Sequence, residues 1–146
     1  MKRTILIIIL IIILVIVAFF GYIIYHTYAP PGKANNVEIS IGNSSKFSKE
    51  EIESAMQAVI KKFKDFRGGD LKQLWHDDKS NYETVYISPG VAVDESNVIV
   101  LYSNFDTDSR SINYGAIPNN TYKNWKWVLI RDNKTSEWKV YNFGYT

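Results

Sequence analysis

The sequence predicts an α+β protein in which an N-terminal transmembrane helix is followed by one amphipathic helix packed on a curved antiparallel sheet. Three observations lead to this prediction. Residues 5–25 form an apolar run, residues 52–66 carry apolar side chains at helical spacing, and most of the remaining chain has the composition of short strands. A helix followed by consecutive strands is typical of an α+β domain.

The apolar run 5–25 contains no charged residue. A helix of this length spans roughly 30 Å at about 1.5 Å per residue, which matches the hydrocarbon core of a bilayer. Lys2 and Arg3 precede the run, so the positive-inside rule predicts a cytoplasmic N-terminus and an extracytoplasmic C-terminal domain. Three tyrosines are expected at the far membrane interface: Tyr22, Tyr25 and Tyr28.

A cleaved signal peptide is the alternative interpretation of this segment. Signal peptides have apolar regions of about 7 to 15 residues followed by a small-x-small cleavage site. The best candidate here is Thr27-Tyr28-Ala29, which Pro30 follows directly. The longer apolar run and the poor cleavage site favour an uncleaved anchor, with the lipid bilayer as partner through residues 5–25.

Composition limits what the exported part can do. Beyond Lys2 and Arg3, the remaining 15 basic residues face 15 acidic ones, a balance that argues against nucleic-acid binding. Cysteine is absent, which excludes disulfides, thiolate metal sites and a cysteine nucleophile. We expect no cofactor and no metal site.

The chain divides into three predicted parts. Residues 1–28 are a cytoplasmic stub and anchor, residues 29–46 a linker that includes a short strand at 37–41, and residues 47–146 an extracytoplasmic α+β domain. The linker opens with APPGKANN, whose prolines, glycine and asparagines disfavour regular structure.

The amphipathic helix has the strongest local signals. Ser48 and Glu51 form a capping box, and Phe47 is placed to pack on Ile52 as a hydrophobic staple. Its apolar face continues to Phe66, and two glycines follow. Residues 70–75 are expected to add one short helical turn capped by Asp70.

Strands are expected over the rest of the domain, at 82–87, 91–93, 98–105, 122–131 and 137–143. The segment 98–105 is apolar on both faces, as a central strand would be. The last two strands form a hairpin through residues 132–135, and residues 106–120 form a polar loop.

Three segments carry a family resemblance: FKDFRGGDLKQLWHDD at 63–78, NVIVLYSNF at 97–105 and NNTYKNWKWVLIRDNKTSEWKVYNFGY at 119–145. Together they resemble the nuclear-transport-factor-2-like superfamily of cone-shaped α+β folds, and more closely the membrane-anchored envelope proteins of Gram-positive bacteria whose domain has no assigned function. The resemblance implies a helix against a curved sheet. It implies no activity, because the superfamily includes both enzymes and binding modules.

His76, Asp77 and Asp78 form a cluster in which a carboxylate could orient an imidazole that acts as a general base. The alternative is a solvated helix exit, which we favour because no second acid, base or oxyanion donor is identifiable. Asp106-Thr107-Asp108-Ser109 resembles the opening of a calcium loop. Ser111 stands at its sixth position and Ile117 at its twelfth, where glycine and glutamate are required, so we favour the alternative of an acidic loop tip that binds no metal.

The aromatic residues of the last hairpin are a second candidate site. If Tyr122, Tyr141 and Phe143 lie on the outer face of the sheet, they form a platform for a glycan or peptide. The alternative, which we favour, is that these rings belong to the core or line a cavity. The function that fits best is a non-catalytic envelope module that binds a protein or small ligand, or is part of a larger assembly. The alternative is a small cavity enzyme that uses His76 with an adjacent Asp as general base.

Overall fold

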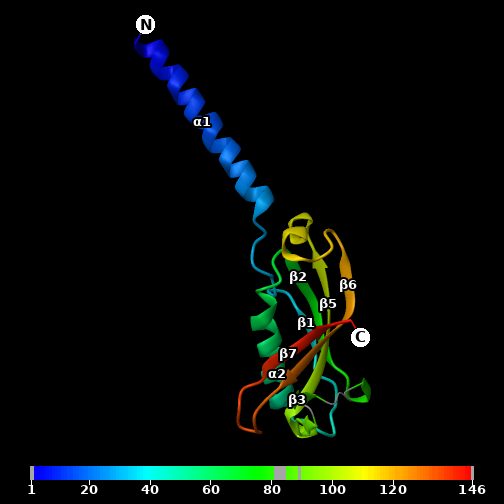
Figure 1. The fold of residues 1–146 in the computed structure, drawn as a ribbon. Coiled ribbons are helices and arrows are strands. Elements are labelled where there is room, and N and C mark those ends of the chain that lie inside the picture. The colour runs from blue at the N-terminus through cyan, green and yellow to red at the C-terminus, as the bar shows by residue number, and fades with distance from the viewer. Residues whose placement is uncertain (1, 81–84, 89, 146) are drawn as a thin grey trace.

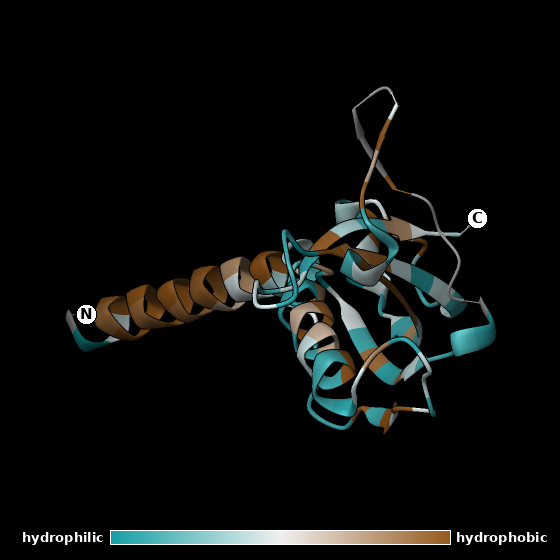
Figure 2. Ribbon diagram, turned by 90° about the horizontal axis from the view of Figure 1, so that it is seen from below, coloured by the Kyte–Doolittle hydropathy of each residue, from teal (hydrophilic) through white to brown (hydrophobic). Residues whose placement is uncertain are grey.

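The computed structural model describes residues 2–80, 85–88 and 90–145, and it shows an α+β domain preceded by one long helix (Figure 1). Helix α1, Lys2–Thr27, projects from the domain, and its apolar colouring is nearly continuous in Figure 2. Among the described residues, Arg3–Thr27 is the one helical stretch long and apolar enough to cross a membrane, and no part of it is buried by the rest of the chain.

Helix α2, Lys49–Phe63, begins as the sequence predicts. Ser48 Oγ accepts a hydrogen bond from the backbone N–H of Glu51 at 3.2 Å, and Glu51 Oε2 accepts one from the backbone N–H of Ser48 at 2.8 Å. Phe47 and Ile52 are both buried in the same cluster. The capping box and the helix are therefore confirmed, although the helix ends at Phe63 and Phe66 lies in the turn that follows it.

Five strands form one sheet in the order β1-β2-β5-β6-β7. Their bounds are Glu38–Ser40 for β1, Gly69–His76 for β2, Val98–Thr107 for β5, Thr121–Ile130 for β6 and Lys139–Gly144 for β7. Strand β5 is central, and β6 and β7 form a hairpin, so both of these predictions are confirmed.

The prediction of an entirely antiparallel sheet is wrong at one edge. Strand β1 pairs with β2 in parallel, whereas the other neighbouring pairs are antiparallel. The chain leaves β1, passes through α2 and returns to begin β2 at the same end, and a helical crossover of this kind joins parallel strands. The sheet is therefore mixed.

The short helical turn expected at residues 70–75 is also wrong, because these residues belong to β2. The pairing of β2 with β5 shifts between Leu71 and Gln73, which inserts one extra residue. Leu71 and Leu74 consequently lie on the same face, and Trp75 on the other. A bulge thus produces the spacing of three that the sequence suggested was helical.

The smaller elements lie mostly at the end of the domain farthest from α1. Strands β3, Tyr86–Ser88, and β4, Val91–Ala92, form a separate two-stranded sheet. They overlap the strands expected at 82–87 and 91–93, of which positions 82–84 lie outside the described residues. The described part of the domain also contains three short 3₁₀ helices: η1 at Asp78–Ser80, η2 at Glu95–Asn97 and η3 at Ser109–Tyr114.

The sheet has a large core on its helical side and a small one on the opposite side. The first joins the buried face of α2 to Leu71, Ile99, Phe105 and Trp127. The second contains four valines: Val85, Val98, Val100 and Val128. Residues buried on both faces of β5 explain its continuous apolar sequence.

The segment that leads from α1 into the domain lies directly against the end of α2. Gly32 N–H donates to the carbonyl of Lys64 at 3.0 Å, and Gly68 N–H donates to the carbonyl of Pro30 at 2.9 Å. Lys33 forms an isolated parallel bridge with Asp70. These bonds hold the exit from α1 close to the beginning of β2.

Candidate functional site

A pocket of about 280 Å³ opens at the end of the sheet nearest α1. Four ends meet there: the turn after α2, the last residues of β5, the first residues of β6 and the last residues of β7. The loop that follows η3 forms one wall. Its lining residues include Phe66, Phe105, Tyr122, Trp125, Phe143 and Ala116.

Aromatic rings form most of the pocket wall. The ring of Phe66 has its centroid 5.8 Å from that of Phe105, 6.2 Å from Trp125 and 5.2 Å from Phe143. Tyr122 stacks on Phe105 with a centroid distance of 4.7 Å. These rings hold one another in edge-to-face and stacked arrangements, which are favourable beyond the area they bury.

Two irregular strand pairings direct these rings toward the helical side of the sheet. In β6, Tyr122 pairs with Phe105 and Trp125 with Ser103, so the strand has one extra residue between them. Asn124 takes a left-handed backbone conformation with φ of 55°, and its N–H donates to Asn104 Oδ1 at 2.9 Å. The bulge lets Tyr122 and Trp125 face the same pocket although they are three residues apart.

The second irregularity lies in β7. Leu129 pairs with Val140 and Val128 with Asn142, which makes Tyr141 the extra residue. Alternation restarts after it, and Phe143 faces the helical side together with Val140.

The polar groups of the pocket lie mainly at its edge. Lys62 Nζ and Asp65 Oδ2 form an ion pair of 3.0 Å, and the hydroxyl oxygen of Tyr122 accepts a hydrogen bond from Ile117 N–H at 2.9 Å. Trp125 Nε1 is shielded from solvent and has no acceptor within the described part of the chain. The pocket wall itself is therefore mainly apolar.

The platform of Tyr122, Tyr141 and Phe143, the less favoured of the two interpretations, does not form on the outer face. Tyr122 is 8% exposed and belongs to the helical-side core. Phe143 contacts Phe66 and Trp125, and Tyr141 alone stands in the bulge with 50% exposure. Two of the three residues thus line the pocket, because two bulges changed the alternation on which the platform depended.

His76 lies at the other end of β2, and its side chain has no exposed surface. Its ring meets Phe47 edge-on at 6.3 Å, and its Nε2 is 4.0 Å from Asp78 Oδ1. Burial lowers the pKa of His76, while the carboxylates of Asp78 and Asp77 act in the opposite direction. A general base must reach the proton that it removes, and this buried imidazole does not reach solvent.

The two neighbouring carboxylates have structural partners. Asp78 accepts hydrogen bonds from Ser44 Oγ at 2.7 Å and from Ser45 N–H at 3.0 Å. These bonds lower the pKa of Asp78, with the Ser45 N–H as the larger cause. Asp77 Oδ1 accepts a hydrogen bond from Lys79 N–H at 3.0 Å. His76, Asp77 and Asp78 therefore lie close together in the structure, and the hydrogen bonds of Asp78 hold the segment before α2.

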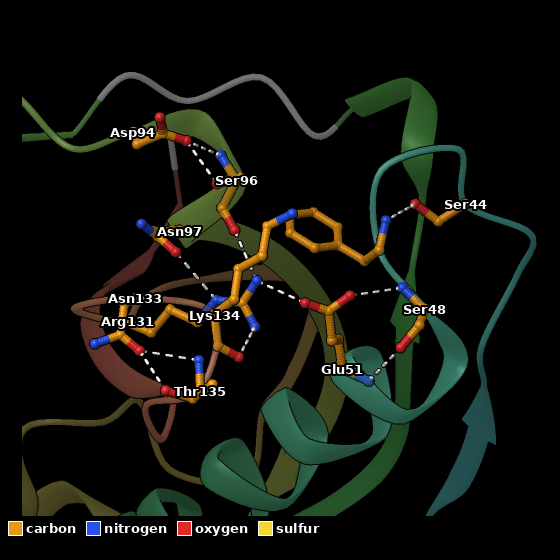
Figure 3. A network of polar contacts seen from close by, with 11 residues as sticks. Ser44, Ser48, Glu51, Asp94, Ser96, Asn97, Arg131, Asn133, Lys134 and Thr135 are labelled. Carbon is orange, nitrogen blue, oxygen red and sulfur yellow. Dashed lines mark hydrogen bonds and ion pairs between the residues drawn. The ribbon is translucent and has the colours of Figure 1, made fainter.

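A buried arginine network lies at the same end of the domain, the end farthest from α1, which is called the distal end below (Figure 3). Arg131 Nη2 donates to Glu51 Oε1 at 2.6 Å and to the carbonyl of Ser96 at 2.9 Å. Its Nε donates to Asn97 Oδ1 at 3.2 Å, and its guanidinium lies 4.3 Å from the ring centroid of Trp138. The chain itself engages this charge on several sides, so the network joins α2, η2 and the β6–β7 hairpin.

Within the described residues, no group of three His, Asp or Glu side chains is placed to hold a metal ion. Comparison of the chain with protein-family models, curated proteins and solved structures finds no match, so the interpretation of the site depends on its geometry.

Sequence reasoning did not assign Phe66, Phe105 or Trp125 to a common site. A signal was present, because aromatic residues concentrate near positions 63–66, 122–127 and 143–145. The end of β5, the start of β6 and the end of β7 meet at one end of the sheet, and the turn after α2 lies beside them. The strand order was needed to bring these clusters together.

Proposed function

We propose that this protein is a membrane-anchored extracytoplasmic module that binds a small apolar or aromatic ligand without chemical conversion. The observation that carries the proposal is the pocket of about 280 Å³ bounded by the rings of Phe66, Phe105, Tyr122, Trp125 and Phe143. Binding sites for small molecules are typically concave and apolar with few polar groups, and their volumes begin near about 300 Å³. The pocket matches this description at the small end of the range.

The chemistry of the walls defines the ligand class. Aromatic faces bind flat or flexible apolar groups by dispersion and by excluding water. Asp65 offsets the charge of Lys62 in their ion pair, so the charge of Arg67 is the one that favours a ligand with a polar or anionic head. A small ring compound or a short acyl chain with one polar or anionic head fits these requirements.

The membrane topology is part of the proposal. The exposed apolar surface of α1 supports a membrane-spanning role, since a helix apolar on every side has no place in water. Lys2 and Arg3 at its start support a cytoplasmic N-terminus. The curved five-stranded sheet packed on α2 supports the proposed relation to the nuclear-transport-factor-2-like superfamily, whose members include binding modules.

The test measures thermal unfolding of the full-length protein in detergent micelles against short fatty acids and small aromatic acids. A ligand at a hundred times its dissociation constant raises the free energy of unfolding by about 2.7 kcal/mol. For a domain of this size the expected rise in Tm is about ten degrees.

The decisive variant is Ala116→Phe, which fills the pocket from the loop side without removing a ring of the wall. We expect it to abolish the ligand-induced rise in Tm. Val91→Phe is the matched control, because Val91 is exposed and lies in β4, away from the pocket. The proposal fails if no compound raises Tm, or if Ala116→Phe responds like the wild type.

A further inference from the structure

The loop around η3 exposes large apolar side chains beside the end of α1. Ile112 is 61% exposed and Ile117 is 63% exposed, and between them the ring of Tyr114 is 42% exposed. In Figure 1 this loop, in yellow, lies at the end of the domain that faces α1. Three large apolar side chains within six residues expose more apolar surface than scattered single residues would.

The loop is attached to the last turns of α1 by two contacts. Asn113 Nδ2 donates to the carbonyl of Thr27 at 3.1 Å, and the guanidinium of Arg110 lies 4.9 Å from the ring centroid of Tyr25. Asp108 Oδ2 accepts from Arg110 Nη2 at 2.6 Å, which holds the guanidinium in place. The loop therefore cannot move away from the helix end without breaking these contacts.

A third contact fixes the loop from the domain side. Arg67 Nη1 donates to the carbonyl of Ala29 at 2.9 Å, and the Arg67 guanidinium lies 5.5 Å from the ring centroid of Tyr114. Because Ala29 follows α1 by two residues, Arg67 joins the helix exit, the turn after α2 and the loop.

These contacts set the depth of the loop relative to a bilayer. If residues 5–25 fill the hydrocarbon core, Tyr25 lies at its edge and Thr27 about 3 Å beyond it along the helix. The headgroup layer extends roughly 5 to 8 Å beyond the hydrocarbon on each side. Arg110 and Asn113, which contact these two residues, are thereby placed in the headgroup layer.

We propose that the loop from Ser109 to Ile117 docks on the outer surface of the same bilayer that holds α1. Ile112 and Ile117 insert at the boundary between headgroups and acyl chains, where the ring of Tyr114 has both an apolar and a polar environment. Arg110 and Arg67 lie at the level of the lipid phosphates. Its contacts with Tyr25 and Thr27 hold the loop beside the end of α1 that leaves the lipid, which is why the bilayer is the occupant that fits best.

Docking would also place the pocket. Tyr114, Gly115 and Ala116 belong to the proposed docking loop and also line the pocket. The pocket would thus open beside the bilayer surface, within reach of a ligand that partitions into the lipid. This inference depends on the proposed membrane anchor, and it is independent of whether the pocket binds a ligand.

The test exploits the absence of cysteine from the chain. Single variants Ile112→Cys and Ile117→Cys are labelled with a polarity-sensitive fluorophore, and the full-length protein is reconstituted in phosphatidylcholine vesicles that contain a minority of phosphatidylglycerol. A nitroxide carried on the lipid near the headgroup serves as quencher. Tyr22→Cys reports on the anchor, and Val91→Cys is an exposed apolar control in β4, on the distal part of the domain.

We expect lipid-borne quenching at Ile112 and Ile117 to be several-fold stronger than at Val91, with a blue-shifted emission. Quenching at Tyr22 but at neither loop position overturns the docking and retains the anchor. Absence of quenching at Tyr22 and at both loop positions overturns the anchor and the docking together. Protection of the loop labels from aqueous iodide without lipid quenching identifies a second copy or another protein as the occupant, which also overturns the proposal.

Discussion

The two ends of the sheet differ in the kind of side chain that they bury. At the distal end, Arg131 is buried and donates to groups of Glu51, Ser96, Asn97 and Lys134, so its donors are directed to acceptors of the chain itself. At the end near α1, aromatic rings surround a pocket and few polar groups face one another.

This difference separates a structural role from the proposed binding role. A buried charge is tolerated where hydrogen bonds surround it, and such a network fixes how several elements are joined. The rings at the other end leave a pocket of about 280 Å³ between them, and that space is available to another molecule. The polar clusters around Arg131 and His76 therefore maintain the fold, whereas the apolar rings provide the candidate site.

The largest effect is expected from breaking the distal network. Arg131→Met removes the hydrogen bonds to Glu51, Ser96 and Asn97 while retaining an apolar chain beside Trp138. Breaking a buried ion pair costs about 3 to 5 kcal/mol, and the partial exposure of Glu51 favours the lower end. We expect the free energy of unfolding to fall by about 3 kcal/mol in urea titrations of the full-length protein.

Lys139→Met is the matched control for this prediction. Lys139 Nζ is 3.3 Å from Asp132 Oδ2, but both side chains are largely exposed. Such pairs contribute roughly 0 to 1 kcal/mol, so the loss should be much smaller. Equal losses in the two variants would contradict a special role for the Arg131 network. Tryptophan fluorescence reports on the domain alone, because α1 contains no tryptophan.

A smaller effect is expected where the exit from α1 lies against α2. A Cβ at Gly32 would overlap the carbonyl oxygen of Phe63, a backbone atom that cannot rotate away. Overpacking of this kind costs about 1 to 3 kcal/mol. Gly32→Ala should therefore reduce stability by about 2 kcal/mol and weaken the hydrogen bond from Gly32 N–H to Lys64, which hydrogen exchange at this amide measures.

Gly90→Ala distinguishes crowding from backbone strain. Gly90 has φ of 78°, and a Cβ there would meet no atom within 4 Å. Its substitution should cost about 1 kcal/mol through strain alone and leave exchange at Gly32 unchanged. If Gly32→Ala were as stable as the wild type, the attachment of this segment to α2 would be looser than its hydrogen bonds indicate.

Local signals explain which parts of the fold could be predicted. The capping box of Ser48 and Glu51 acts over three residues, and the apolar sequence of β5 reflects burial on both faces. The parallel pairing of β1 was not predictable in this way, because its partner β2 follows a whole helix later. Pairing between distant segments depends on the tertiary structure and not on local propensity.

The bulges explain why the candidate site was missed. Each extra residue moves the following side chains to the opposite face of the strand. The bulge after Leu71 gave β2 a helical spacing, and the one at Tyr141 turned Phe143 toward the pocket. Strict alternation would put Tyr122, Tyr141 and Phe143 together on the outer face, whereas the structure directs Tyr122 and Phe143 to the pocket, in agreement with the favoured interpretation as core or cavity lining.

The smallest effect concerns His76, the buried histidine of the distal end. Burial lowers its pKa in the folded protein, against the opposing charges of Asp78 and Asp77. As the pH falls below about 6.5, the unfolded chain therefore binds the proton first, and the free energy of unfolding decreases until the pH reaches the folded-state pKa. The contribution of His76 to the free energy of unfolding is complete above about pH 6.5 and is lost as the pH falls below that value.

The carboxylates of the same end titrate in a separate range. The Ser48 N–H and, against burial, Arg131 lower the pKa of Glu51, so its contribution is lost only below its ordinary value of about 4.3. Urea titrations between about pH 7 and pH 5.5 should consequently show a decline that His76→Gln removes. An equal decline in His76→Gln would mean that another group titrates there, and the distal end would then owe its pH dependence to charges outside the His76 cluster.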